Sequence, residues 1–218
     1  ETVSITTDTD IDGIYKQIKD FFKDYNELIK AMDTAYNADS SKGYEPLTSD
    51  EKEAMTDDEV KEWEKKIKDS LLRKDSTLGN ASTAMKTIMS SSISINGKSY
   101  SLANFGIKTQ GYFSSGTNEK GVFHIDGNSD DSVSSANEDK LKAAIASDPD
   151  TVISFFSKLS ADLYSDLGKK MQATSLSSSL KVYNDKEMAK EYSDYTTKIS
   201  DKETQISTWE DFYYKKFS

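Results

Sequence analysis

The residue of this chain best suited to acid–base chemistry is His124, the only histidine among 218 residues. A Ser-His-Asp triad or a multi-histidine metal site could be built only around it. It lies between Phe123 and Ile125 in a short alternating segment, which predicts a strand residue whose side chain points into solvent. There is no cysteine, so disulfides, thiolate nucleophiles and thiolate metal sites are excluded. We therefore predict no catalytic residue.

The sequence DTDIDG at residues 8–13 is the nearest approach to a metal motif. It places carboxylates at positions one, three and five of a calcium loop and glycine at six, but position twelve, which requires a bidentate Glu, is Lys19. A second acidic loop from Asp126 has Asp131 at position six and Asn137 at twelve. These acids are better explained as helix-capping and loop residues, and we predict no metal site.

Phosphate and cofactor motifs are absent from the sequence: it has neither a P-loop nor a GxGxxG segment. Asn80-Ala81-Ser82 matches a glycosylation sequon, but it falls in a predicted helix, where chance is the simpler explanation. No carboxylate pair lies in an apolar loop that would raise its pKa for glycoside hydrolysis. We therefore expect no enzymatic activity and no cofactor.

The composition restricts the partners and the shape. The chain has 28 Lys and Arg against 38 Asp and Glu, a net charge of −10, which argues against nucleic acid as a partner. No apolar run approaches the roughly 18 to 20 residues that cross a bilayer, which argues against a membrane. Only 35% of residues are hydrophobic. We expect a mainly α fold, an elongated helical bundle with narrow apolar faces and a small antiparallel β-hairpin.

The segment after residue 10 predicts a long helix. Its apolar residues recur at alternating spacings of three and four: Ile11, Ile14, Ile18, Phe21, Tyr25, Leu28, Met32 and Ala35. A second row, Tyr15, Phe22, Ile29 and Tyr36, widens this face, so we expect the helix to contact two neighbours in a bundle. Before it, Val3 and Ile5 alternate with polar residues and predict a strand.

The middle of the chain predicts shorter elements. Capping boxes at Thr48 and Thr56 start helices near 49–54 and 57–73, and a further helix is expected at 76–89. Asn96-Gly97 joins two short alternating segments into a hairpin, and residues 121–125 read as another strand. Two more helices follow, the second starting at Asp148-Pro149 and burying Val152, Phe155, Phe156, Leu159, Leu163 and Leu167.

The last segment predicts a second long heptad helix. Its repeat is Met188, Tyr192, Tyr195, Ile199, Lys202, Ile206, Trp209 and Tyr213. We expect Tyr192, Tyr195 and Ile199 to pack within one bundle. Toward the end the apolar residues cover more than one face, which favours contacts with other subunits. The candidate contact residues are Tyr195, Ile199, Lys202, Ile206, Trp209, Phe212, Tyr213 and Phe217.

Five segments carry a resemblance to a known family. They are TVSITTDTDIDGIYKQIKDFFKDYNELI, YEPLTSDEKEAMTDDEVKEWEKKIKDSLLRKDSTL, YSLANFGIKT, EDKLKAAIASDPDTVISFFS and WEDFYYKKFS. Together they resemble, in order, the C-terminal region of the flagellar hook-associated protein 2 family of filament cap proteins. A longer polar loop at 126–135 departs from the family pattern.

The resemblance implies a domain plan and a location. Residues 1–8 would be an exit strand from a missing head domain, 9–92 and 137–183 two parts of a helical leg, 93–136 a small β and loop region, and 184–218 a truncated C-terminal coiled coil. Because ETVSITTDTD has neither an initiating Met nor a signal region, we expect either that a segment was processed off or that this is a piece of a longer protein, and the resemblance favours the piece. The family implies a ring-shaped homo-oligomer at the flagellar tip, outside the cell and exported by the flagellar type III system. Its implied partners are flagellin and the hook–filament junction proteins.

Two other functions remain open at this point. One is a surface adhesin or host-binding module, with the acidic, Ser/Thr-rich surface and the hairpin region as its ligand face. The other is an intracellular coiled-coil scaffold, whose expression would not depend on flagellar export.

Overall fold

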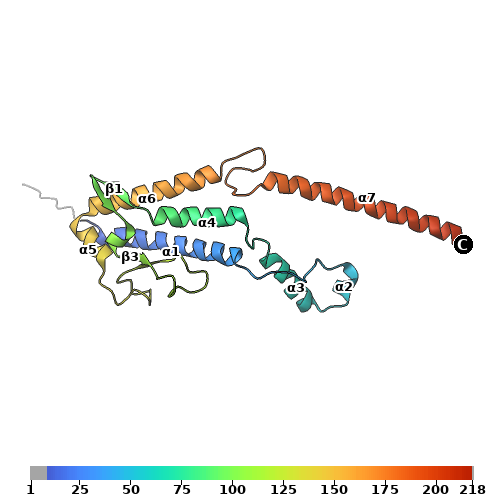
Figure 1. The fold of residues 1–218 in the computed structure, drawn as a ribbon, viewed down its shortest axis with the longest axis horizontal. Helices are drawn as coiled ribbons and strands as arrows, with labels where there is room; N and C mark the ends of the chain where they lie inside the picture. The colour runs from blue at the N-terminus through green and yellow to red at the C-terminus, as the bar shows by residue number, and fades with distance from the viewer. Residues whose placement is uncertain (1–8, 218) are drawn as a thin grey trace, which may run out of the picture. The chain divides into compact units, whose positions relative to one another are not determined.

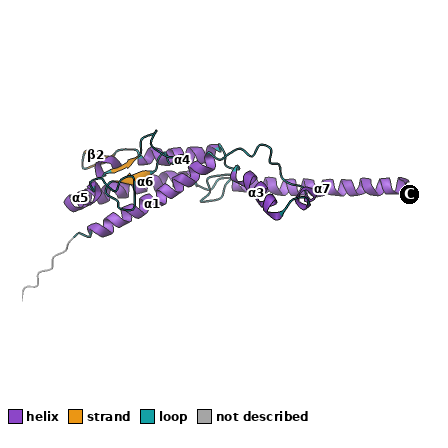
Figure 2. Cartoon of the chain, turned by 90° about the horizontal axis from the view of Figure 1, so that it is seen from below, coloured by secondary structure: helices purple, strands orange, loops and turns teal. Residues whose placement is uncertain are grey.

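The computed structural model describes residues 9–217, and the strand expected near Val3 and Ile5 lies outside this range. The described part is mainly helical, as predicted, and carries seven α-helices and two small antiparallel sheets, one more sheet than expected (Figure 1). Strands make up a much smaller part of the described chain than helices do (Figure 2). Contacts divide it into two units, the first ending at Asp166 and the second beginning at Leu167.

Helix α1 spans Ile11–Tyr36 and starts where the Asp10 side chain accepts a 2.8 Å hydrogen bond from the Gly13 amide. The acids of the calcium-like motif that lie within the described residues are therefore at the start of a helix. Among residues 9–217 no group of three or more metal-ligating side chains occurs.

The buried face of α1 differs from the predicted heptad. Its buried residues are Ile18, Phe22, Tyr25, Ile29 and Asp33, whereas Leu28 is exposed and Phe21 is only partly covered. The face that packs inward thus combines two members of the heptad with two of the flanking row. A heptad identifies the helix, but the neighbours on either side decide which flank is covered.

The core of the first unit lies between three helices and the second sheet. Helix α4 (Ser76–Met89) runs beside α1, and α6 (Pro149–Lys170) lies on the far side of α4 in the view of Figure 1. Phe22 of α1 contacts Phe123 and Phe156, with ring centroids 5.7 and 6.3 Å apart. Of the residues predicted to be buried in α6, Leu167 alone is not.

Local capping sets the start of most helices. Both predicted capping boxes form, Thr48 with Glu51 before α2 (Ser49–Glu53) and Thr56 with Glu59 before α3 (Asp57–Asp69). Helix α3 ends four residues before the predicted end at 73, and Leu71, which follows it, is 71% exposed. Trp63 is held on α3 by Tyr44, with ring centroids 4.8 Å apart, and donates to the Glu45 carbonyl.

Two hairpin-like pairs form the β region. Strands β1 (Ile93–Ile95) and β2 (Lys98–Tyr100) pair around Asn96-Gly97, both at positive φ, as predicted. The second sheet pairs β3 (Ile107–Thr109) with β4 (Phe123–Ile125), and only β4 was predicted. A 3₁₀ turn, η1 (Leu102–Phe105), connects the sheets and buries Leu102 and Phe105.

The end of the first unit follows the predicted order. Helix α5 spans Lys140–Ser147, and α6 begins at Pro149, where the Asp148 carboxylate accepts a 3.1 Å hydrogen bond from the Thr151 amide. This bond and the Thr151 hydroxyl hold the pKa of Asp148 below its usual range. Residues 171–184 form the joint between α6 and the last helix, α7, which spans Asp185–Phe217.

Candidate assembly surface on the C-terminal helix

The sole histidine is not the solvated residue that the sequence predicted. The His124 side chain is only 19% exposed, and its Nδ1 lies 2.7 Å from Oδ2 of Asp131. Burial alone would raise the pKa of Asp131, but hydrogen bonds from His124 and the Val133 amide outweigh it and lower that pKa. This pair fastens the 126–138 loop to β4, and the neighbouring Ser134 hydroxyl donates to the Ile125 carbonyl rather than to His124.

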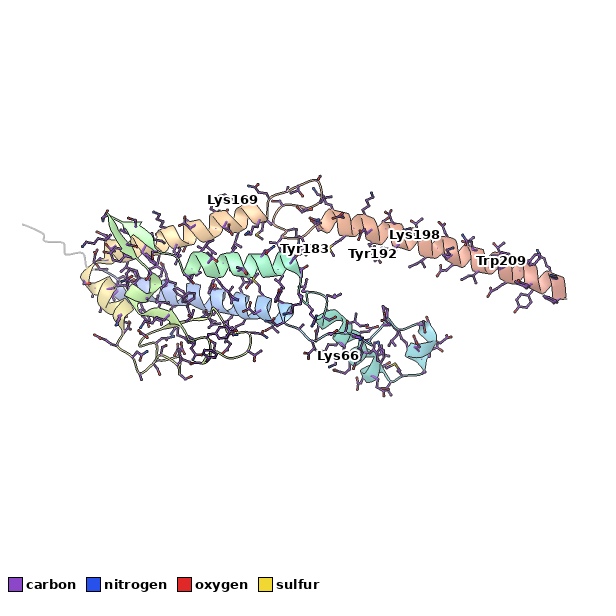
Figure 3. The ribbon with its side chains drawn as sticks, viewed as in Figure 1. Lys66, Lys169, Tyr183, Tyr192, Lys198 and Trp209 are labelled. Atoms are coloured by element: carbon purple, nitrogen blue, oxygen red, sulfur yellow. The ribbon has the colours of Figure 1, made fainter. Side chains whose placement is uncertain are left out.

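The candidate contact residues all lie on α7, which has no buried residue between Asp185 and Phe217. Figure 3 shows Tyr192, Lys198 and Trp209 standing out from this helix. Tyr192 is 77% exposed, Tyr195 62% and Ile199 60%, so the bundle packing expected of these three does not form within their own unit, residues 167–217. The repeat is an apolar face, broken only at Lys202, that no other part of its own unit, residues 167–217, covers.

The C-terminal turns of α7 hold their aromatic rings in a row. Trp209 stacks on Tyr213 and Tyr213 on Phe217, each pair with centroids 6.2 Å apart. Phe212 meets Trp209 and Tyr213 edge to face. Ile206, Trp209, Tyr213 and Phe217 line a shallow open hollow along this one helix. A hollow with a single wall cannot enclose a small molecule, but it can receive the side chains of another helix.

Lys202 interrupts this face with a charge. Its ammonium donates a 3.1 Å hydrogen bond to Oε1 of Gln205, and both side chains are exposed. Elsewhere on α7 the hydroxyls of Thr196, Thr204 and Thr208 donate to carbonyls four residues back, so they need no outside partner. These threonine hydroxyls are thus satisfied along the helix itself, whereas the apolar side chains of the repeat are exposed.

The start of α7 is fixed within its own unit. The Asp185 carboxylate accepts a 2.6 Å hydrogen bond from the Ser178 amide, which lowers the pKa of Asp185. The Lys186 ammonium donates to the Thr174 carbonyl, and the Lys186 amide to the Leu176 carbonyl. The joint therefore folds back over the first turn of the helix and leaves the rest bare.

The fold and this surface define a class: a mainly helical protein with a long C-terminal helix whose aromatic side chains are exposed. A sequence model of the family described as "Flagellar hook-associated protein 2 C-terminus" matches residues 1–218, and the chain belongs to this family. It is a structural family, so the chain is not an enzyme.

A curated relative supports the same assignment. Flagellar hook-associated protein 2 of Halalkalibacterium halodurans is 28% identical over 152 residues, covering 70% of this chain. The match takes in 25% of the relative, so the chain spans about a quarter of its length. No solved structure matches the chain. Among the described residues, no helix is long and apolar enough to cross a membrane.

Proposed function

We propose that this chain is the C-terminal part of a filament cap protein at the distal end of the bacterial flagellum. The complete protein would be exported by the flagellar type III system and form a ring-shaped homo-oligomer outside the cell. The ring would retain flagellin and promote its insertion without covalent chemistry, and hook–filament junction proteins would be further partners. Family membership supports the location, and the bare face of α7 supports the assembly role.

The exposed face of α7 is the observation that carries the proposal. Its large apolar side chains are between 51% and 77% exposed: Met188, Tyr192, Tyr195, Ile199, Ile206, Trp209, Phe212, Tyr213, Tyr214 and Phe217. Burial of each such side chain is worth about 1.5 to 3 kcal/mol. A soluble chain rarely leaves so continuous a patch uncovered unless a partner covers it.

The candidate contacts divide by expected role. The apolar members, among them Trp209, Tyr213 and Phe217, would supply the buried centre of the contact, where aromatic residues dominate binding energy. Lys202 would cost affinity at the interface and fix register or partner, as charged positions in coiled coils do.

The test is a double substitution, Trp209→Ala with Tyr213→Ala, in the full-length protein. Ring formation, measured by light scattering, and motility should both fall, while helicity by circular dichroism stays the same. Tyr164→Ala is the matched control, since Tyr164 is 80% exposed on α6, outside this face. Unchanged ring formation and motility in the double variant would show that this face of α7 is not the assembly surface.

The adhesin hypothesis keeps one supporting observation. Tyr112 and Phe113 lie in the β3–β4 connection with exposures of 69% and 99%. Deleting residues 93–135 would be a poor test, because it removes buried Phe105, Ile107 and Phe123 from the core. Replacing Tyr112 and Phe113 by Ala is cleaner: loss of cell binding with motility preserved would favour adhesion.

A further inference from the structure

A surface hollow of about 460 Å³ opens where three parts of the first unit meet. The lysine hollow, as we call it, is lined by Asp33 and Asn37 at the end of α1, Lys74, Asn80 and Lys86 before and on α4, and Lys120 in the β3–β4 connection. Its volume lies in the range typical of ligand sites. It is separate from α7 and plays no part in the proposed assembly surface.

The hollow gathers positive charge in an acidic chain. Three ammonium groups face one carboxylate, Asp33, and that carboxylate is already bound by Lys86 at 2.6 and 2.8 Å and by the Ser82 hydroxyl. Within residues 9–217 neither Lys74 nor Lys120 forms a salt bridge. The local balance is 3 − 1 = +2, against −10 for the whole chain.

The lysines are positioned by the fold. Lys74 has a φ of 58°, a conformation unfavourable for a residue with a side chain, and its amide donates a 2.9 Å hydrogen bond to the Tyr36 carbonyl. Its ammonium lies 3.0 Å from Oδ1 of Asn37. Gly121 permits close approach to Lys86, because a Cβ there would lie 2.8 Å from the lysine stem. Charges held in place cost less to order when a ligand binds.

An aromatic rim adjoins the hollow. Tyr112 and Phe113 line a second depression together with Asp33, Asn37 and Lys120, so the two depressions share residues. The Lys120 ammonium sits 3.5 Å from the centre of the Tyr112 ring, and its hydrogen bond and its charge lower the pKa of Tyr112. Phe113 is 99% exposed, which leaves a whole aromatic side chain free for contact.

We propose that the lysine hollow binds the carboxylates of an acidic segment of a protein partner, while Tyr112 and Phe113 contact an apolar side chain of the same segment. The excess positive charge selects an oxyanion. The aromatic rim favours an oxyanion that has an apolar group next to it in the same molecule. A free inorganic anion has no such group.

The test uses the 218-residue chain and two acetylated peptides, Gly-Asp-Phe-Asp-Gly and its amide counterpart Gly-Asn-Phe-Asn-Gly, followed by amide chemical shifts in NMR titrations. Citrate and inorganic phosphate are the free-anion probes. The acidic peptide should bind at least about fivefold more tightly than the amide peptide and weaken with added salt. Its shifts should concentrate at Asn37, Lys74, Asn80, Phe113 and Lys120.

Two double variants complete the test. Lys74→Ala with Lys120→Ala should weaken the acidic peptide about five- to tenfold. Lys23→Ala with Lys158→Ala removes the same charge from exposed positions elsewhere and should leave binding unchanged. Lys86 is retained because it neutralises Asp33. Three results would each overturn the proposal. The two peptides could bind equally well, the two double variants could lose equal affinity for the acidic peptide, or citrate or phosphate could bind while the acidic peptide does not.

Discussion

Helices α1 and α7 carry the same alternating three-and-four spacing of apolar residues, yet only α1 is covered by other elements of its own unit. Ile29 on α1 is fully buried, whereas Ile199 on α7 is 60% exposed. The spacing therefore predicts a helix and an apolar face, but it does not predict which partner covers that face. The comparison separates side chains that stabilise the fold of this chain from side chains that are available to contact another chain.

The largest effect on stability should come from removing a buried side chain of α1. Phe22→Ala removes a 2%-exposed ring that contacts Phe123 and Phe156, and should lower the unfolding free energy by about 3 to 5 kcal/mol. Trp209→Ala on α7 removes a larger ring from an exposed position and should change it by less than about 0.5 kcal/mol. Urea denaturation of both variants measures the contrast, and similar losses would mean that α7 is covered within the chain.

A smaller effect is expected at the ion pair between α1 and α4. Asp33→Ala leaves the Lys86 ammonium without its 2.6 and 2.8 Å contacts and the Ser82 hydroxyl without its acceptor. We expect a loss of about 2 to 3 kcal/mol in urea denaturation.

Two further variants check the cause of that loss. Replacing both partners, Asp33→Leu with Lys86→Met, should recover much of the stability, because no uncompensated charge remains. Asp20→Ala breaks an exposed pair with Lys16 on the same helix and should have no measurable effect. A loss at Asp20 equal to that at Asp33 would contradict the role of burial.

The pair His124 and Asp131 should make stability depend on pH. The native pKa of Asp131 is lowered from its usual 3.8, so folding favours its ionised form. That stability is fully present above 3.8 and is lost as the pH falls through the lowered native value. Asp131→Asn should therefore cost about 1 kcal/mol at neutral pH, and the gap to the natural chain should close in acid.

Denaturation at a series of pH values measures this gap. Asp162→Asn, which removes an exposed carboxylate of α6, should leave the natural pH dependence intact. A gap at Asp131 that persists unchanged well below pH 3.8 would show that packing, rather than the charge, is lost.

Features set by neighbouring residues could be predicted from the sequence. The capping boxes at Thr48 and Thr56, the Asn96-Gly97 turn and the start at Pro149 each depend on contacts within four residues. The domain boundaries stay a prediction.

Features that need distant segments could not be predicted. Strand β3 is three residues long and is defined only by its pairing with β4. The burial of His124 depends on the path of the loop that brings Asp131 back to it. The lysine hollow draws on α1, α4 and the β3–β4 connection, and no local pattern joins them. The candidate contacts on α7 were found by their spacing, but their exposure required the structure.

The smallest effect on the stability of the chain is expected for a substitution at Lys202. This substitution also tests most directly the difference between the covered face of α1 and the exposed face of α7. Lys202→Leu removes an exposed side chain whose ammonium, among residues 9–217, hydrogen-bonds the exposed Gln205, so the unfolding free energy should stay within about 0.5 kcal/mol. If the α7 face pairs with another helix, removing the one charge from the repeat should strengthen self-association and relax its register. Lys190→Leu makes the same change off the repeat and should leave association unaltered. Sedimentation of the full-length variants measures both, and equal gains would show that general hydrophobicity, not the α7 face, drives association.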